Sequence, residues 1–149
     1  MNFGMIRYLL GRILLILSAL LLPALIIGLA FREPFRILLG FIVAIAFCAG
    51  LGFLMARNKP QNEDFYAREG LVLVALAWIM VSVIGAIPFV LSGSVPSVVD
   101  ALFESTSGFT TTGASVLNIV PGFLPKSLMF WRNFTMFIGG MGFLFFIIS

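Results

Sequence analysis

The chain has 149 residues, of which 61% are hydrophobic and only 10% are charged, and its mean hydropathy is +1.16. Soluble globular domains have a smaller apolar fraction and a larger charged fraction, so the composition indicates a polytopic membrane protein. The formal charge of +3 might suggest nucleic-acid binding, but a small excess of Lys and Arg at the ends of membrane spans explains it.

The residue inventory also excludes most catalytic and metal chemistry. The chain has no histidine and a single cysteine, Cys48, so neither an internal disulfide nor a zinc site of Cys and His can form. The serines and threonines have no evident partner base, and the sequence contains no G-x-x-x-x-G-K-[ST] phosphate loop and no G-x-G-x-x-G motif. The sequence therefore predicts a protein that is not an enzyme and that uses no organic cofactor.

Two hydrophobic spans come first in the chain. Residues 13–31 and residues 37–56 are uncharged, and each run is long enough for the ~20-residue helix that crosses a bilayer. Arg12, just before the first run, can extend its side chain back to the interface. Small residues that permit close helix packing recur along the second run, at Gly40, Ala44, Gly50 and Gly52.

A hydrophilic segment separates these spans from a third one. Residues 57–69 are the only clearly hydrophilic stretch of the chain, and we expect them to form a loop between helices. Residues from Gly70 to about 91 form another uncharged run and predict a third membrane helix, with Pro88 near its end. Residues 92–96 contain Gly, Ser and Pro and should turn the chain.

The stretch 100–117 differs from its surroundings because its middle is polar but uncharged, with Ser and Thr crowded around two glycines. Ser97 and Asp100 have the spacing of a capping box. This spacing predicts a short helix from Ser97 to about Ser107, which Gly108 should end. Such a helix is roughly 16 Å long, about half of the ~30 Å hydrocarbon core of a membrane.

A half-length helix followed by an extended Thr/Gly segment, between two hydrophobic spans, has the layout of a pore loop. Extended backbone at membrane depth is tolerable only inside protein or beside a water-filled cavity. There, backbone carbonyls can replace the water around a dehydrated cation, towards which the negative end of the short helix points. The carbonyls concerned are those of Thr110, Thr111, Thr112 and Gly113. The alternative is a Thr/Gly-rich surface loop that binds no ion.

Charged residues near this stretch are further candidates for functional roles. Asp100 and Glu104 are the only acids after Glu69, and an acid at membrane depth is costly unless it has a partner. For Asp100, a helix cap is the simpler explanation. Glu104 could pair with Arg132, and it could either support the structure or attract cations. Arg132 follows Trp131, and these two residues could instead form an interfacial anchor.

The last predicted elements are a rigid turn over residues 121–126 and a fourth span from Ser127 to Ser149. Glycines at 139, 140 and 142 would let this span pack closely against a neighbour. Lys and Arg are almost evenly divided between the two sides of the resulting topology, so charge alone does not decide its orientation.

Three parts of this pattern resemble one family. They read FESTSGFTTTGAS at 103–115, REG, AW and GAIPF between 68 and 89, and FWR and GGMG between 130 and 142. Together they resemble the Trk/Ktr/HKT superfamily of potassium transporters, and most closely the membrane subunit of bacterial Trk potassium uptake systems. The resemblance covers roughly residues 68–149, whereas the first sixty or so residues resemble the family only as a hydrophobic helix pair.

The resemblance implies an all-α membrane protein with two leading transmembrane helices in residues 1–56 and a cytoplasmic loop at 57–69. Residues 70–149 would form one helix–pore loop–helix repeat of a potassium-channel-like fold. Because family members carry four such repeats, we expect the chain to be an N-terminal piece. In the family, glycine at the position of Gly113 accompanies potassium selectivity, and serine in some plant relatives accompanies sodium transport.

The implied function is potassium uptake across the bacterial inner membrane, passive or coupled to another ion, with a cytoplasmic N-terminus. The implied partners are membrane lipid, a second full-length subunit and a peripheral nucleotide-binding regulatory subunit, but no nucleic acid. Potassium is the transported ion. Its ligands would be the backbone carbonyls named above, with support from Glu104, Gly108 and Arg132. The alternative is a non-conducting membrane scaffold, or a decayed or truncated gene product that keeps the motif.

Overall fold

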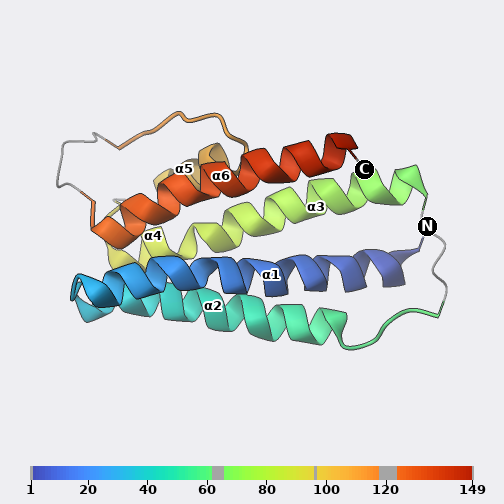
Figure 1. Cartoon of the computed structure of the whole chain (residues 1–149), viewed down its shortest axis with the longest axis horizontal. Helices are drawn as coiled ribbons and strands as arrows, with labels where there is room; N and C mark the ends of the chain where they lie inside the picture. Colours follow the sequence, from blue (N-terminus) through green and yellow to red (C-terminus); the bar gives the residue numbers. More distant parts are fainter. Residues whose placement is uncertain (1, 62–65, 96, 118–123, 149) are drawn as a thin grey trace.

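The computed structural model describes residues 2–61, 66–95, 97–117 and 124–148, with 143–148 as backbone only. These residues form an all-helical structure. Its helices are α1 (Phe3–Ala30), α2 (Phe35–Ala56), α3 (Ala67–Gly85), α4 (Ile87–Ser92), α5 (Val98–Phe109) and α6 (Lys126–Ile148). The long helices lie side by side, with the N-terminus, the start of α3 and the C-terminus at one end (Figure 1).

Three segments of the described structure are long and apolar enough to cross a membrane. They are α1, α2 and the run Ala67–Ser92, which combines α3 and α4. The first and third helices begin earlier than the uncharged runs predicted, because a charged side chain ends an apolar run without ending a helix. At α1, Asn2 accepts the N–H of Met5 at 3.1 Å, and at α3, Glu69 accepts the N–H of Tyr66 at 3.2 Å. Both contacts satisfy N–H groups at the helix start.

α1 and α2 form an antiparallel hairpin with a close backbone contact (Figure 1). A Cβ atom on Gly11 would lie 2.8 Å from the carbonyl oxygen of Gly52, and one on Gly52 would lie 2.9 Å from that of Gly11. Gly40 similarly approaches the backbone of Pro88 in α4. These contacts confirm the packing role predicted for Gly40 and Gly52. A Cβ atom on Gly50 would meet no atom of another part of the described structure within 4 Å, so Gly50 takes no part in the contact.

The third span is divided at Ala86, where α3 ends and α4 begins. Pro88 has no N–H group and so cannot make the helical hydrogen bond to the residue four positions earlier. The carbonyl oxygen of Gly85 accepts a hydrogen bond of 3.0 Å from Nε1 of Trp131, a fully buried residue of α6. The break in the third span is therefore tied directly to the last helix.

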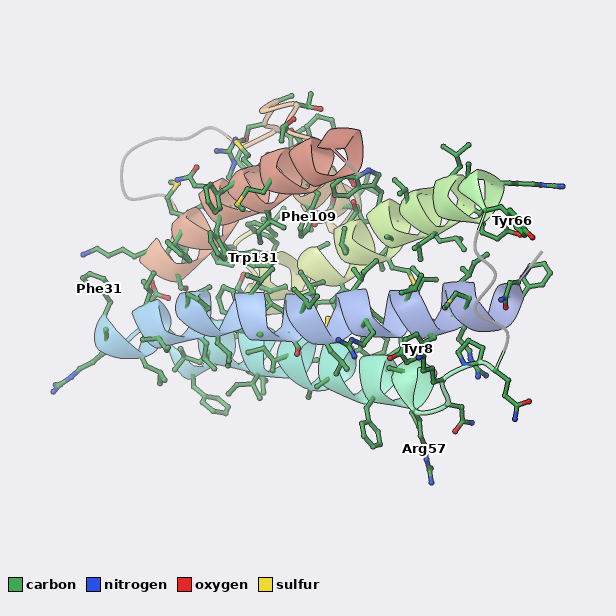
Figure 2. All side chains as sticks on the ribbon, turned by 45° about the vertical axis from the view of Figure 1, so that its right-hand side comes forward. Tyr8, Phe31, Arg57, Tyr66, Phe109 and Trp131 are labelled. Atoms are coloured by element: carbon green, nitrogen blue, oxygen red, sulfur yellow. The ribbon has the colours of Figure 1, made fainter. Side chains whose placement is uncertain are left out.

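The leading hairpin also holds the beginning of α6. The Glu33 carboxylate, in the turn between α1 and α2, accepts the Ser127 N–H at 3.1 Å and the Ser127 hydroxyl. Phe31 lies at the end of the molecule where α6 begins (Figure 2), with the Lys126 ammonium 3.8 Å from the centre of its ring. Glu33 thus supplies a carboxylate to the positive end of a helix from a distant part of the chain.

Candidate functional site

The site is built around α5, the short helix between the third span and α6. Its first turn has the predicted cap, because the Ser97 hydroxyl oxygen accepts the N–H of Asp100 at 3.1 Å. Asp100 lies in that first turn, where a carboxylate is favourable to the helix dipole. This position fits the helix-start role that we considered simplest for Asp100.

The prediction that Gly108 ends the helix is wrong, because α5 continues to Phe109. Gly108 is instead a site of close helix contact. A Cβ atom there would lie 3.0 Å from the Cβ of Thr135 in α6, and nearer still to the Thr135 hydroxyl. The chain leaves the helix through two residues with positive φ, Thr111 at 58° and Gly113 at 75°.

Two further glycines hold the C-terminal end of α5 between α3 and α6. A Cβ atom on Gly85 would lie 2.6 Å from Cε2 of Phe109, and one on Gly139 would lie 2.8 Å from the Phe109 carbonyl carbon. Phe109 also meets Trp131 edge-on, with ring centroids 6.2 Å apart (Figure 2). Gly139 therefore has the packing role predicted for it. Gly140 and Gly142 have more space around them. A Cβ atom on Gly140 would lie 3.8 Å from Thr111, and one on Gly142 would lie 3.5 Å from Trp78.

The segment after α5 is folded back onto the helix. The N–H groups of Thr112 and Gly113 lie 3.0 and 3.4 Å from the carbonyl oxygen of Ser107, and the Ser107 hydroxyl donates to the carbonyl of Ala114 at 2.6 Å. In the described part of the chain, no hydrogen-bond donor reaches the exposed carbonyls in between. These carbonyls belong to Thr110, Thr111, Thr112 and Gly113.

The backbone at Thr111 is strained, whereas the backbone at Gly113 is not. A positive φ is rare for a β-branched residue such as threonine, and a strained residue costs on the order of 1–3 kcal/mol. Glycine adopts the same region without penalty. The Thr110 and Thr112 hydroxyl oxygens lie 2.8 Å apart on either side of Thr111. Local side-chain and backbone hydrogen bonds thus hold the turn at Thr111 in place.

Glu104 connects three parts of the repeat. Its Oε2 accepts a 2.9 Å hydrogen bond from Nε of Arg132 in α6, and its Oε1 accepts from the Ser115 hydroxyl at 2.6 Å and the Val116 N–H at 2.8 Å. The Ser115 hydroxyl in turn accepts the N–H of Leu117 at 3.1 Å. One carboxylate therefore fixes α5, the segment that follows the exposed carbonyls, and α6 relative to one another.

The structure defines the surroundings of the two charged residues. Glu104 is 1% exposed and Arg132 is 8% exposed, so Arg132 is a buried partner of Glu104 and not an interfacial anchor. A buried carboxylate is stable only when paired and hydrogen-bonded, and both oxygens of Glu104 are bound by protein donors.

Carboxylate clusters offer no other cation site in the described structure, where no group of three or more His, Cys, Asp or Glu side chains gathers. The exposed carbonyls after α5 are oxygen atoms of the kind that could bind a dehydrated cation. The sequence pattern pointed to these carbonyls and to Glu104, Gly108 and Arg132. It missed Ser107 and Ser115, whose hydroxyl contacts depend on how the chain folds back, and Thr135, whose contact with Gly108 depends on the packing of α6.

Comparison with known proteins identifies close likenesses. A family model described as "TrkH: Cation transport protein" matches residues 33–148. The Trk system potassium uptake protein TrkH of Halomonas elongata is 34% identical over 144 residues, which make up 95% of this chain and 29% of that protein. An uncharacterized cation transporter of Methanocaldococcus jannaschii is 39% identical over 140 residues, 93% of this chain and 28% of that protein.

A solved structure agrees with these sequence matches. The crystal structure of the potassium transporter TrkH from Vibrio parahaemolyticus superimposes with a TM-score of 0.86 at 30% sequence identity. The match covers 95% of this chain and 30% of that one. The chain therefore spans less than a third of the length of the relatives that it resembles.

Proposed function

The chain belongs to the TrkH family of cation transport proteins, and from this premise we propose that it supplies one wall of a potassium-selective pore. The observation that carries the proposal is the row of exposed carbonyls at Thr110, Thr111, Thr112 and Gly113, which no described donor binds. Carbonyls of this kind can replace the hydration shell of potassium. They follow the C-terminal end of α5, where the helix dipole is negative and favours a cation.

The proposal assigns different tasks to the ligands and to their support. The four carbonyls bind the ion, and Gly113 permits the left-handed backbone that the last of them needs. Glu104 and Arg132 position the segment from behind, and Gly108 allows α6 to lie close to α5. None of these tasks needs an enzymatic group or an organic cofactor.

We further propose the membrane arrangement that the family resemblance implies. Residues 1–56 are the two leading spans, residues 57–69 lie in the cytoplasm of a bacterium, and residues 70–149 form one helix–pore loop–helix repeat in the inner membrane. α5 and its carbonyls would enter from the outer side. The predicted turn at 121–126 lies largely outside the described residues.

A ring of carbonyls is needed to surround an ion, and one loop supplies only a quarter of it. The relatives that this chain resembles are more than three times its length. We therefore propose that three further repeats complete the pore, and that the complete transporter is a homodimer under a nucleotide-binding regulatory subunit. A non-conducting scaffold is the alternative function, and it predicts no effect of the carbonyl segment on ion flux.

The experiment replaces the matching segment of the TrkH protein of Halomonas elongata with this chain. It measures potassium and sodium uptake in a potassium-uptake-deficient strain. Gly113→Ser should reduce the potassium-to-sodium uptake ratio on the order of tenfold, because a left-handed backbone costs serine roughly 1–2 kcal/mol. Thr112→Ser should have a smaller effect, since its carbonyl stays in place.

The matched control is Gly50→Ser, the same exchange at a glycine of α2 with open space around it. It should leave uptake and selectivity unchanged. If Gly113→Ser behaves like this control while the chimera transports potassium, Gly113 is not part of a selectivity filter. If the chimera reaches the membrane and transports nothing, the scaffold is the better account.

A further inference from the structure

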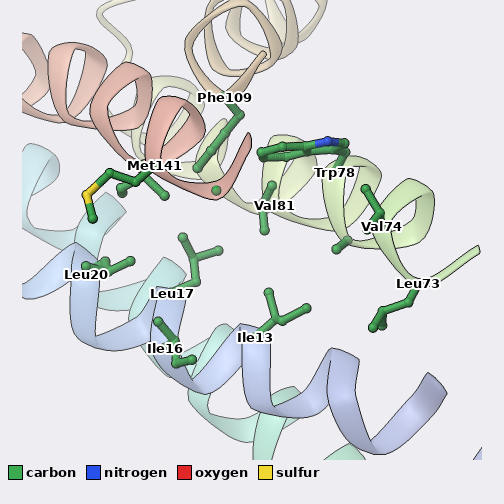
Figure 3. A pocket seen from close by; sticks show the side chains of 13 residues that line it. Ile13, Ile16, Leu17, Leu20, Leu73, Val74, Trp78, Val81, Phe109 and Met141 are labelled. Carbon is green, nitrogen blue, oxygen red and sulfur yellow. The ribbon is translucent and has the colours of Figure 1, made fainter. Parts of the chain in front are cut away.

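An apolar crevice of about 630 Å³ opens between α1, α3 and α6 (Figure 3). Its walls are aliphatic and aromatic, with Ile16 and Leu20 on α1, Trp78 and Val81 on α3, and Met141 on α6. This volume falls within the range of ~300–1,000 Å³ typical of small-molecule sites. Two of the helices that form it, α1 and α3, belong to segments that are long and apolar enough to cross a membrane, so the crevice lies at a depth where lipid chains can reach it.

One wall of the crevice continues into a polar pair. Tyr8, Arg12, Ile16 and Leu20 recur at a spacing of four along α1, so they follow one side of the helix. The last two line the crevice, and the Arg12 Nη1 atom lies 3.5 Å from the Tyr8 hydroxyl. The guanidinium therefore points back along α1 towards its N-terminal end, away from the apolar crevice.

Arg12 is exposed and has no carboxylate partner among the described residues. An unpaired cation inside a hydrophobic span is costly, and it is stabilised by an anion that can reach it. An apolar protein segment laid over the crevice would leave this charge unpaired. A molecule that combines an anion with an apolar chain would satisfy the guanidinium and the crevice together.

We propose that the crevice binds one acyl chain of an anionic phospholipid, whose phosphate is held by Arg12 beside Tyr8. From Arg12 to Leu20, the helix rises about 12 Å, so a headgroup at Arg12 leaves its chain beside the apolar wall. The lipid belongs to the leaflet at the end of the molecule where α1 begins (Figure 1). Neither the lipid site nor its test depends on the pore function proposed above.

Trp78 provides a reporter, because it lines the crevice, whereas Trp131, the second tryptophan, is fully buried. The chain is reconstituted in phosphatidylcholine vesicles that contain either phosphatidylglycerol or phosphatidylcholine with brominated acyl chains. At equal mole fractions, we expect brominated phosphatidylglycerol to associate about fivefold more strongly, as judged by fluorescence quenching, since one Arg near an anionic lipid contributes about 1 kcal/mol. Trp78→Phe should remove this selective quenching.

Two substitutions separate the site from general attraction of a basic protein to anionic lipid. Arg12→Gln should abolish the preference for phosphatidylglycerol, while Arg7→Gln, which removes an equal charge from the same helix but off the Tyr8–Leu20 side, should keep it. Ala77→Phe, which fills the crevice, should reduce quenching by both lipids.

Three results would overturn the proposal. They are equal quenching by the two brominated lipids, equal losses with Arg12→Gln and Arg7→Gln, and protection of Trp78 by a second copy of the chain. The last result would appear as weaker quenching at higher protein density, together with a cross-linked dimer.

Discussion

The leading hairpin and the repeat that follows it are held together by different forces. In the described structure, no side-chain hydrogen bond joins α1 to α2, and the hairpin depends on close contact such as that between Gly11 and Gly52. The repeat depends on buried polar contacts, most of all those of Glu104 with Arg132 and Ser115. In lipid, apolar burial does not drive helix association. Close van der Waals packing therefore holds the hairpin together, whereas hydrogen bonds and an ion pair hold the repeat together.

This difference predicts where a single substitution does most damage. Glu104→Ala leaves the Arg132 guanidinium buried without its partner, and breaking a buried ion pair in this way costs about 3–5 kcal/mol. We expect this loss in the free energy of unfolding, measured by titration with a denaturing detergent. We also expect greater exposure of residues 110–116 to proteolysis, because the contacts of Glu104 with Ser115 and Val116 are lost as well.

The control is a double-mutant cycle. Glu104→Gln combined with Arg132→Gln removes both charges, so the double variant should lose clearly less stability than the sum of the two single variants. Additive losses would show that the two side chains are not energetically coupled, and that the repeat does not depend on their ion pair.

The next largest loss of stability should come from replacing a packing glycine in either region. Gly108→Ala would bring a methyl group against Thr135, and Gly52→Ala would bring one against the backbone of Gly11. Overpacking of this kind costs about 1–3 kcal/mol, and we expect both variants to lose that much free energy of unfolding. Only Gly108→Ala should also weaken the contact of Glu104 with Arg132, because it pushes α6 away from α5. Hydrogen exchange of the Val116 amide, which Glu104 binds, measures that difference.

The two regions also differed in how far the sequence could predict them. Apolar runs placed the hairpin, and Gly40 and Gly52 were correctly expected to pack, because helix geometry and residue size alone determine such contacts. In the repeat, composition located α5 and the carbonyl segment. It could not distinguish Gly108 as a packing glycine from Gly108 as a helix end, because both need a residue without a side chain and only the position of Thr135 decides. The selectivity role of Gly113 stays a prediction.

One of the contacts that join the two regions was indicated by no sequence pattern. Glu33 in the hairpin turn binds Ser127 at the start of α6, far along the chain. Glu33→Gln keeps the shape but removes the charge from the helix end, where it contributes about 0.3–1 kcal/mol. We expect a loss of that size in stability and faster hydrogen exchange of the Ser127 amide. Glu33→Asp keeps the charge but shortens the side chain. If Asp loses stability and Gln does not, the reach of the side chain and not its charge is what matters.

The smallest effect should have the opposite sign. Gly50 lies in α2 close to Gly52, but its ideal Cβ position has no atom within 4 Å in the described structure. An alanine there adds no clash and removes the backbone entropy that glycine loses on folding, which is worth roughly 0.5–1 kcal/mol in a helix. Gly50→Ala should therefore raise the free energy of unfolding slightly, while Gly52→Ala lowers it. The two glycines lie two residues apart in the same apolar run of α2, so composition cannot account for opposite signs. A loss of stability with Gly50→Ala would mean that this face of α2 is packed against something in the membrane, and that shape constrains the hairpin on two sides instead of one.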